Sequence, residues 1–139
     1  MNGRYTLTIV KPRAVEKGYT APILNMIHEG GFRISALKML RFNRDDAERF
    51  YEVHRGRPFY EGLIEFMISG PIVVAILEKE HAVEDFRKLI GNTDPALAEE
   101  GTIRKLYAES VRSNAVHGSD SDENAAREAS FFFSTAERF

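Results

Sequence analysis

The sequence predicts an α+β domain in which a sheet of short strands packs against helices. Segments with strand-like and helix-like patterns alternate along the chain, without a linker, a repeat or a low-complexity tract. Of the 139 residues, 43% are hydrophobic, and a chain of this length can bury a core without disulfides or metals. We therefore expect a single domain that spans residues 1–139.

The first third of the chain predicts strand, helix, strand and helix. Residues 4–10, RYTLTIV, alternate in polarity and are rich in β-forming residues. Residues 21–31 have apolar residues at helical spacing and stop at two glycines. Residues 32–42 predict a second strand. A helix over residues 43–55 would begin at an asparagine, a good N-cap, with two aspartates in the first turn, where the helix dipole favours them.

The middle of the chain predicts a short helix, a buried strand and another helix. Residues 57–70 predict a helix that ends at a glycine. Residues 71–78, PIVVAILE, are continuously apolar, which indicates a strand covered on both faces. Residues 81–91 then predict a further helix.

The last third has a weak pattern up to residue 114, with a turn at NTDP and one short helical piece at most. Residues 114–118, NAVHG, predict a brief strand, and the tail predicts a final helix. The main elements therefore follow the ferredoxin-like order βαββαβ, an antiparallel sheet with helices on one face and an added C-terminal helix. If helices cover only one face, the 71–78 strand needs cover from extra helices or a partner subunit, so we expect an oligomer.

The charge and composition exclude several classes of protein. A net charge of −2 argues against a general nucleic-acid binder, and no apolar run approaches the ~20 residues of a membrane span. The chain has no cysteine for disulfide or thiolate chemistry. The first residues lack the pattern of a signal peptide, so we expect a cytoplasmic protein with no nucleic-acid or membrane partner.

The common phosphate-binding and hydrolase motifs are absent. The sequence has no G-x-x-x-x-G-K-[ST], no G-x-G-x-x-G, no kinase-type catalytic loop and no G-x-S-x-G. The four histidines, at positions 28, 54, 81 and 117, show no metal-ligand spacing, so we expect no metal ligands in the chain.

The segment HGSDSDE, which begins at His117, suggests a catalytic histidine. Ser119, Asp120 or Ser121 can cap the helix that follows. At ~100° per residue, Glu128 lies at the edge of the apolar arc of this helix, from where it could reach back to Ser119 or the imidazole. A nucleophilic histidine needs such orientation. A structural histidine at a helix cap is the alternative, and these residues alone leave both open.

The segment NAVHGSDS resembles the signature of the nucleoside diphosphate kinases, in which the histidine is phosphorylated by a nucleoside triphosphate. The resemblance covers almost the whole chain, from TLTIVKPRAV through RPFYEGLIEFMISGPIVVAILE, GNTDP and GTIR to NAVHGSDSDENAAREASFFF. It implies an enzyme, a nucleoside-diphosphate kinase, that transfers a γ-phosphate by a ping-pong route. A catalytically silent nucleotide-binding relative is the alternative. An RNA-recognition domain is disfavoured, because PIVVAILE has no aromatic residue.

The resemblance also implies the catalytic residues. His117 matches the histidine that is phosphorylated at its pros nitrogen, Nδ1. Glu128 and Ser119 match the pair that supports it. Tyr51 matches a tyrosine close to that histidine, although by its helical spacing it could equally be a core residue.

A further set of residues matches the nucleotide contacts of the family: Lys11, Phe59, Arg87, Thr93, Arg104, Val111 and Asn114. Lys11 would reach the sugar and phosphates, Arg87, Thr93 and Arg104 the phosphates, and Asn114 the ribose. Phe59 and Val111 would hold the base between them. The plainer alternatives are a surface lysine, exposed arginines and a core phenylalanine. Stacking accepts every base, since each has a π-face.

The resemblance implies nucleoside triphosphates and diphosphates as partners, with Mg²⁺ bound through their phosphates. Asp120 is the residue that could reach the ion through water. It also implies a homo-oligomer, a tetramer or hexamer built from dimers. Arg13, Lys105 and Leu106 depart from the family pattern. None of them is a matched site residue, so they bear on subunit contacts and the mouth of the site.

Overall fold

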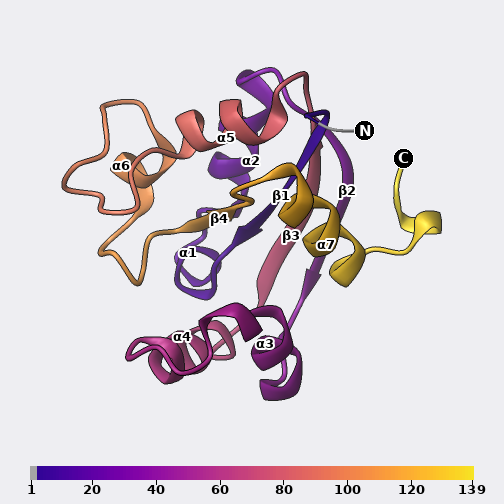
Figure 1. Ribbon diagram of the computed structural model, residues 1–139. Coiled ribbons are helices and arrows are strands. Elements are labelled where there is room, and N and C mark those ends of the chain that lie inside the picture. The colour runs from indigo at the N-terminus through magenta and orange to yellow at the C-terminus, as the bar shows by residue number, and fades with distance from the viewer. Residues whose placement is uncertain (1–2) are drawn as a thin grey trace.

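The computed structural model describes residues 3–139 and contains a four-stranded antiparallel sheet with the strand order β2-β3-β1-β4 (Figure 1). The strands are β1 (Tyr5–Val10), β2 (Arg33–Leu40), β3 (Ile72–Glu78) and β4 (Val116–Gly118). The helices are α1 (Pro12–Glu16), α2 (Thr20–Glu29), α3 (Arg44–Phe50), α4 (Tyr60–Met67), α5 (Ala82–Ile90), α6 (Ile103–Tyr107) and α7 (Asp122–Phe132). Two 3₁₀ turns cover Glu52–His54 and Thr135–Glu137.

The predicted ferredoxin-like α+β fold is confirmed. The crossover helices α2 and α5 pack on one face of the sheet, in a core cluster that includes Ile27 and Phe86. The added helices α3, α4 and α7 pack on the other face, in a second cluster that includes Phe50, Ile64 and Ala129. The sheet is thus covered on both sides.

Strand β3 is covered on both faces, as its apolar run predicts. Val74 and Ile76 belong to one core cluster, whereas Val73, Ala75 and Leu77 belong to the other. Extra helices of the same chain supply the second cover, so this strand gives no argument for a partner subunit. The oligomer stays a prediction on other grounds.

One helix ends earlier than predicted, and a second one, α1, was not predicted at all. The predicted 43–55 helix begins as expected, since Asn43 accepts a hydrogen bond from the Asp46 amide at 2.8 Å, but α3 ends at Phe50 and a 3₁₀ turn follows. The five-residue helix α1 has proline at its first position, which suits a helix N-terminus, but it is too short to show helical spacing. No helix of the described residues is long and apolar enough to cross a membrane.

The sheet brings the two ends of the candidate site together. Strand β1 lies between β3 and β4, and Ile9 pairs with His117 in the register. Lys11 follows β1 directly, and its amide donates to the Ala115 carbonyl at 2.9 Å. The lysine and the histidine therefore lie on neighbouring segments, although they are at opposite ends of the sequence.

Candidate active site

A pocket of about 1230 Å³ collects the predicted site residues. Ten of the eleven line it, from elements spread over the whole chain: Lys11, Tyr51, Phe59, Arg87, Thr93, Arg104, Val111, Asn114, His117 and Glu128. Ser119, the remaining one, is fully buried behind the histidine.

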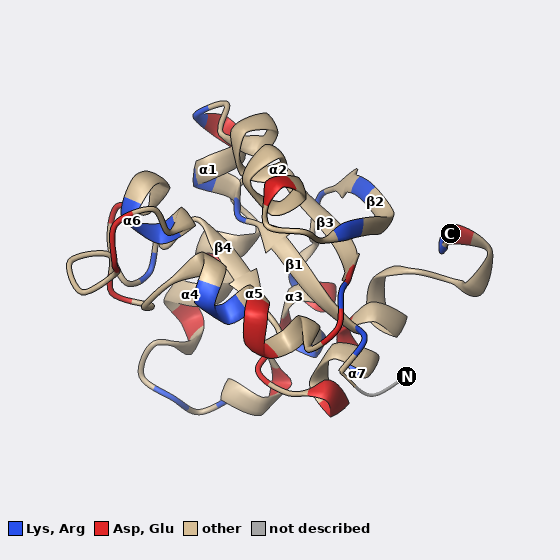
Figure 2. Cartoon of the chain, turned by 90° about the horizontal axis from the view of Figure 1, so that it is seen from above, with Lys and Arg blue, Asp and Glu red and all other residues tan. Residues whose placement is uncertain are grey.

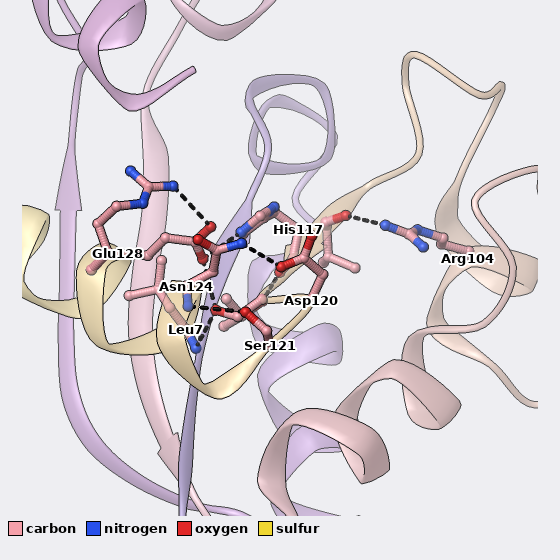
Figure 3. Close-up of polar contacts among 11 residues, drawn as sticks. Leu7, Arg104, His117, Asp120, Ser121, Asn124 and Glu128 are labelled. Carbon is pink, nitrogen blue, oxygen red and sulfur yellow. Dashed lines mark hydrogen bonds and ion pairs between the residues drawn. The ribbon is translucent and has the colours of Figure 1, made fainter. Parts of the chain in front are cut away.

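His117 is held by a carboxylate on α7 (Figure 3). Its Nε2 lies 2.8 Å from Oε1 of Glu128, a residue that is only 5% exposed. Because a carboxylate can only accept, Nε2 carries the proton, and in the neutral ring Nδ1 keeps its lone pair. Nδ1 has no hydrogen-bond partner among the residues that the structure describes. The hydrogen bond at Nε2 orients the ring, and Nδ1 is left with an available lone pair.

Ser119 completes a short hydrogen-bond chain behind the histidine. Its hydroxyl donates to Oε1 of Glu128 at 2.7 Å and accepts from the Leu7 amide at 3.2 Å. Oε1 of Glu128 thus accepts two hydrogen bonds, one from His117 in β4 and one from Ser119, which directly follows β4. Glu128 therefore contacts both Ser119 and His117, as its place at the edge of the apolar arc of this helix predicts. Of the three possible caps, Ser121 is the one that caps α7.

Two residues that the sequence did not single out pack around this centre. The Phe50 ring meets the His117 ring edge-on, with centroids 5.8 Å apart and planes at 76°. The Arg127 guanidinium lies over Phe50 and within 3.7 Å of Oε2 of Glu128. Phe50 is buried in the core, and the side chain of Arg127 is half exposed. Only the tertiary packing brings them to the site.

Tyr51 is both a buried residue and a wall of the pocket. It is 7% exposed, and its hydroxyl has no hydrogen-bond partner in the described part of the chain. Burial, together with the negative charge of Glu128, raises the pKa of the Tyr51 hydroxyl. The group therefore stays protonated, as a hydrogen-bond donor without a partner in the described residues.

One end of the pocket concentrates positive charge. Lys11 is 8% exposed and donates from Nζ to Oδ1 of Asn114 at 2.7 Å. Burial, aided by the nearby Arg104, lowers the pKa of Lys11 to about 7. Burial, aided by Arg87, lowers the pKa of Arg104 to about 10. Basic segments of α5 and α6 (blue in Figure 2) carry these two arginines. Such a cluster favours an anionic ligand.

Arg104 is not the exposed arginine that its sequence context allowed. It is 7% exposed, and its three nitrogens donate to the carbonyls of Asn114, Gly91 and Val116 at 3.3, 3.0 and 2.9 Å. These bonds fix the backbone on both sides of the pocket. The guanidinium of Arg104 therefore holds the backbone around the pocket in place and also adds positive charge to the pocket.

The other end of the pocket is an apolar slot. Phe59 and Val111 line it and remain 44% and 55% exposed, so the alternative of a core phenylalanine does not hold. Val111 lies in a turn closed by a 2.8 Å bond from the Glu109 amide to the Ser113 carbonyl. Glu109 forms ion pairs with Arg13 and Lys17, so the Arg13 departure lies next to this slot.

Asp120 is the one other acidic residue of the pocket lining besides Glu128. Its carboxylate accepts from the Asn124 side chain at 2.6 Å, which lowers the pKa of Asp120. Among the described residues no group of three or more acidic or histidine side chains is placed to hold a metal ion. A cation at this site would need most of its ligands from a bound molecule.

Known proteins match this chain over nearly its full length. The family model described as nucleoside diphosphate kinase matches residues 4–138. The nucleoside diphosphate kinase of Flavobacterium psychrophilum is 58% identical over 134 residues, 96% of each chain. That of Chlorobaculum tepidum is 59% identical over 132 residues, 95% of this chain and 94% of its own.

Solved structures agree with the sequence relatives. The Aquifex aeolicus nucleoside diphosphate kinase superposes with a TM-score of 0.95 at 46% identity and covers 97% of this chain and 98% of its own. The Halobacterium salinarum enzyme, solved in complex with CDP, has a TM-score of 0.91 at 32% identity, with 97% and 90% covered. On these matches, and with the fold they share, the chain belongs to the nucleoside diphosphate kinase family.

Proposed function

We propose that this protein transfers the γ-phosphate of a nucleoside triphosphate to a nucleoside diphosphate through a phosphohistidine at Nδ1 of His117. The observation that carries the proposal is the 2.8 Å contact between Nε2 of His117 and Glu128. It leaves Nδ1 as the free basic nitrogen of a ring that lines a large pocket. Membership in the nucleoside diphosphate kinase family supports the same reaction.

In the first half-reaction, the Nδ1 lone pair attacks the γ-phosphorus in line. An N–P bond forms while the bond from the γ-phosphorus to the bridging oxygen breaks, and the diphosphate leaves with that electron pair. The ring keeps its proton on Nε2 and becomes positively charged, and the Glu128 carboxylate stabilises this charge. In the second half-reaction a terminal oxygen of another diphosphate attacks the same phosphorus, and the electron pair returns to Nδ1.

The remaining residues position the phosphates and balance their charge. Phosphoryl transfer depends mostly on positioning and on neutralising the charge of the transferred group. Lys11, Arg87 and Arg104 supply the positive charge at the phosphate end. Thr93 adds a hydroxyl there. The Tyr51 hydroxyl, which has no partner among the described residues, would donate a hydrogen bond to the transferred phosphate.

The nucleotide enters as its Mg²⁺ complex, so the metal belongs to the substrate. Bound Mg²⁺ neutralises phosphate oxygens, and the ionised Asp120 is the pocket carboxylate that would contact its water shell. Asn114 would hold the ribose, with Phe59 and Val111 on either side of the base. The CDP complex of the Halobacterium salinarum relative supports a nucleotide as the ligand.

We further propose that the chain forms a homo-oligomer, a tetramer or hexamer built from dimers. Large apolar side chains are exposed on the edge strand β2, where Leu37 is 50% and Met39 is 61% exposed. Exposed apolar residues on an edge strand favour pairing with another chain. Light scattering coupled to gel filtration would measure the mass, and a monomer would contradict the proposal.

Labelling with γ-³²P-ATP tests the catalytic proposal. We expect an acid-labile, base-stable label on the wild-type protein that any nucleoside diphosphate discharges. The His117→Ala variant should take no label, whereas His28→Ala, which changes an exposed histidine outside the pocket, should label normally. Folded wild-type protein that binds nucleotide without labelling would indicate a silent nucleotide-binding relative.

A further inference from the structure

Arg112 is a pocket arginine with no assigned role. It follows Val111 in the turn closed by the Glu109–Ser113 backbone bond and lines the pocket at its apolar slot. Its guanidinium forms no hydrogen bond or ion pair with any residue in the described part of the chain. Glu61 on α4 is paired instead with Arg44 at 3.3 Å. Its donors are therefore available to a ligand.

The guanidinium of Arg112 rests face-on against Gly62 of α4. A Cβ atom added at Gly62 would lie 2.7 Å from Cζ, Nη1 and Nη2 of Arg112 alike. Equal distances to these three atoms mean that the flat face of the group, and not an edge, covers the glycine. Because the N–H bonds of a guanidinium lie in its plane, they point parallel to the helix surface at Gly62 and not into it. We call this position on Gly62 the seat of the guanidinium, and any side chain larger than glycine at position 62 would overlap it.

This seat places Arg112 across the slot. Phe59 is the N-cap of α4, and Gly62 lies in the first turn of that helix. Val111, on the facing wall, directly precedes Arg112. One side chain thus extends from the Val111 wall to the Phe59 wall, where the edge of a base stacked between them would lie. The phosphate end, with Lys11 and Arg104, belongs to other elements.

Building on the proposed function, we infer that Arg112 determines base specificity by donating hydrogen bonds to the edge of the stacked base. A guanidinium has donors only, so it favours bases that present carbonyl oxygens: guanine, hypoxanthine, uracil and thymine. Adenine and cytosine present amino groups at the corresponding position and gain less. Stacking on Phe59 does not distinguish the bases, so the edge contact decides the order.

Discharge of the phosphorylated protein by paired diphosphates tests this inference. IDP and ADP are a matched pair that differs at position 6 of the purine, and UDP and CDP are the pyrimidine counterpart. We expect wild-type kcat/KM to favour IDP over ADP, and UDP over CDP, by about tenfold, near the lower end of arginine–guanine discrimination.

Two variants at Arg112 and one control sharpen the test. Arg112→Met keeps the unbranched stem of the side chain but removes the guanidinium that covers Gly62, and with it the donors, so the IDP/ADP ratio should fall to about one. Arg112→Gln can both donate and accept, as glutamine does with adenine, so the ratio should shift in favour of ADP. Arg41→Met changes an exposed arginine outside the pocket lining and should keep the wild-type ratio.

A wild-type ratio within twofold of one, or a wild-type ratio retained by Arg112→Met, would overturn the inference. If the Arg112 variants do not fold, Gly62→Ala serves instead, because its Cβ displaces the guanidinium from its seat. Its ratio should also fall toward one, and an unchanged ratio counts against Arg112. A wild-type protein that forms no phosphoenzyme contradicts the proposed function, and the IDP/ADP ratio of calorimetric affinities then tests Arg112 separately.

Discussion

Lys11→Met should make the nucleotide-free protein more stable while it weakens nucleotide binding. The Lys11 ammonium is buried, has one hydrogen bond, to Asn114, and lies near another cation. Its pKa of about 7, against an ordinary 10.5, means that the fold disfavours the charged form. Methionine has a similar shape and no charge to bury, so it removes this cost.

The size of the effect follows from that pKa difference. The gap between 10.5 and about 7 corresponds to about 5 kcal/mol, at about 1.4 kcal/mol per pH unit, as an upper bound. Relaxation around a buried charge reduces it, and the Asn114 oxygen left without its donor costs about 1–2 kcal/mol. We expect a net gain of about 2 kcal/mol in the free energy of unfolding below pH 7.

The pH dependence identifies the cause. Between pH 7 and 10.5 the unfolded chain holds the Lys11 proton and the folded chain does not, so wild-type stability rises with pH across this window. Below pH 7 both states are protonated and the cost is fully present. The advantage of Lys11→Met should therefore be largest at pH 6 and shrink steadily toward pH 10.

Urea unfolding of both proteins from pH 6 to pH 10 measures this difference directly. Lys105→Met, at an exposed lysine, should show no pH-dependent difference from wild type. Isothermal titration should show weaker nucleotide binding by Lys11→Met and proton uptake by the wild-type protein on binding, because phosphates favour the charged lysine. A variant less stable than wild type at pH 6, or a difference that is flat with pH, would refute the reasoning.

Three further substitutions test the geometry of the site. Glu128→Gln keeps an acceptor near Nε2 but removes the negative charge, so the phosphorylation of His117, measured by quenched flow, should slow by about 30- to 100-fold. A decrease in rate under threefold would contradict the stabilising role of the carboxylate. Tyr51→Phe removes a buried hydroxyl without a partner, so thermal unfolding should show no loss of stability while phosphorylation slows; a lower Tm would reveal a missed partner. Ala115→Gly relieves a backbone φ of 73°, and urea unfolding should show a gain of about 1 kcal/mol; a loss would mean that the alanine side chain contributes more through packing than the backbone costs.

Much of the fold could be predicted from local patterns. The 71–78 strand is apolar on both faces because core clusters lie on both sides of it, and the Asn43 cap follows from its own side chain. The break after Phe50 could not be predicted, since the residues up to 55 keep a helical pattern, whereas the structure continues after Tyr51 as a 3₁₀ turn. The short helix α1 is below the length at which spacing is informative.

The contacts around His117 could be predicted where one helix carries the information. Glu128 sits at the edge of an apolar arc, and that position alone suggested its reach toward Ser119 and His117. Arg112 could not be found in this way, because it lies in a turn and its guanidinium packs on a glycine of the distant helix α4. Sequence spacing does not reveal a contact between an exposed arginine and a glycine so far away along the chain.

The basic end of the pocket is costly to the empty protein for the same reason that it would suit the phosphates of a nucleotide. Burial lowers the pKa of Lys11 and of Arg104, and the Tyr51 hydroxyl has no partner among the described residues. Each of these groups would gain from an anion, and they come from the end of β1, from α6 and from the end of α3. The phosphates of a bound nucleotide would bring negative charge to the pocket that all three line. Removing the Lys11 charge should therefore stabilise the empty fold and weaken binding, so stability and affinity oppose each other at this residue. Arg104 differs, because its guanidinium also donates to three backbone carbonyls, and its removal should cost stability as well as binding.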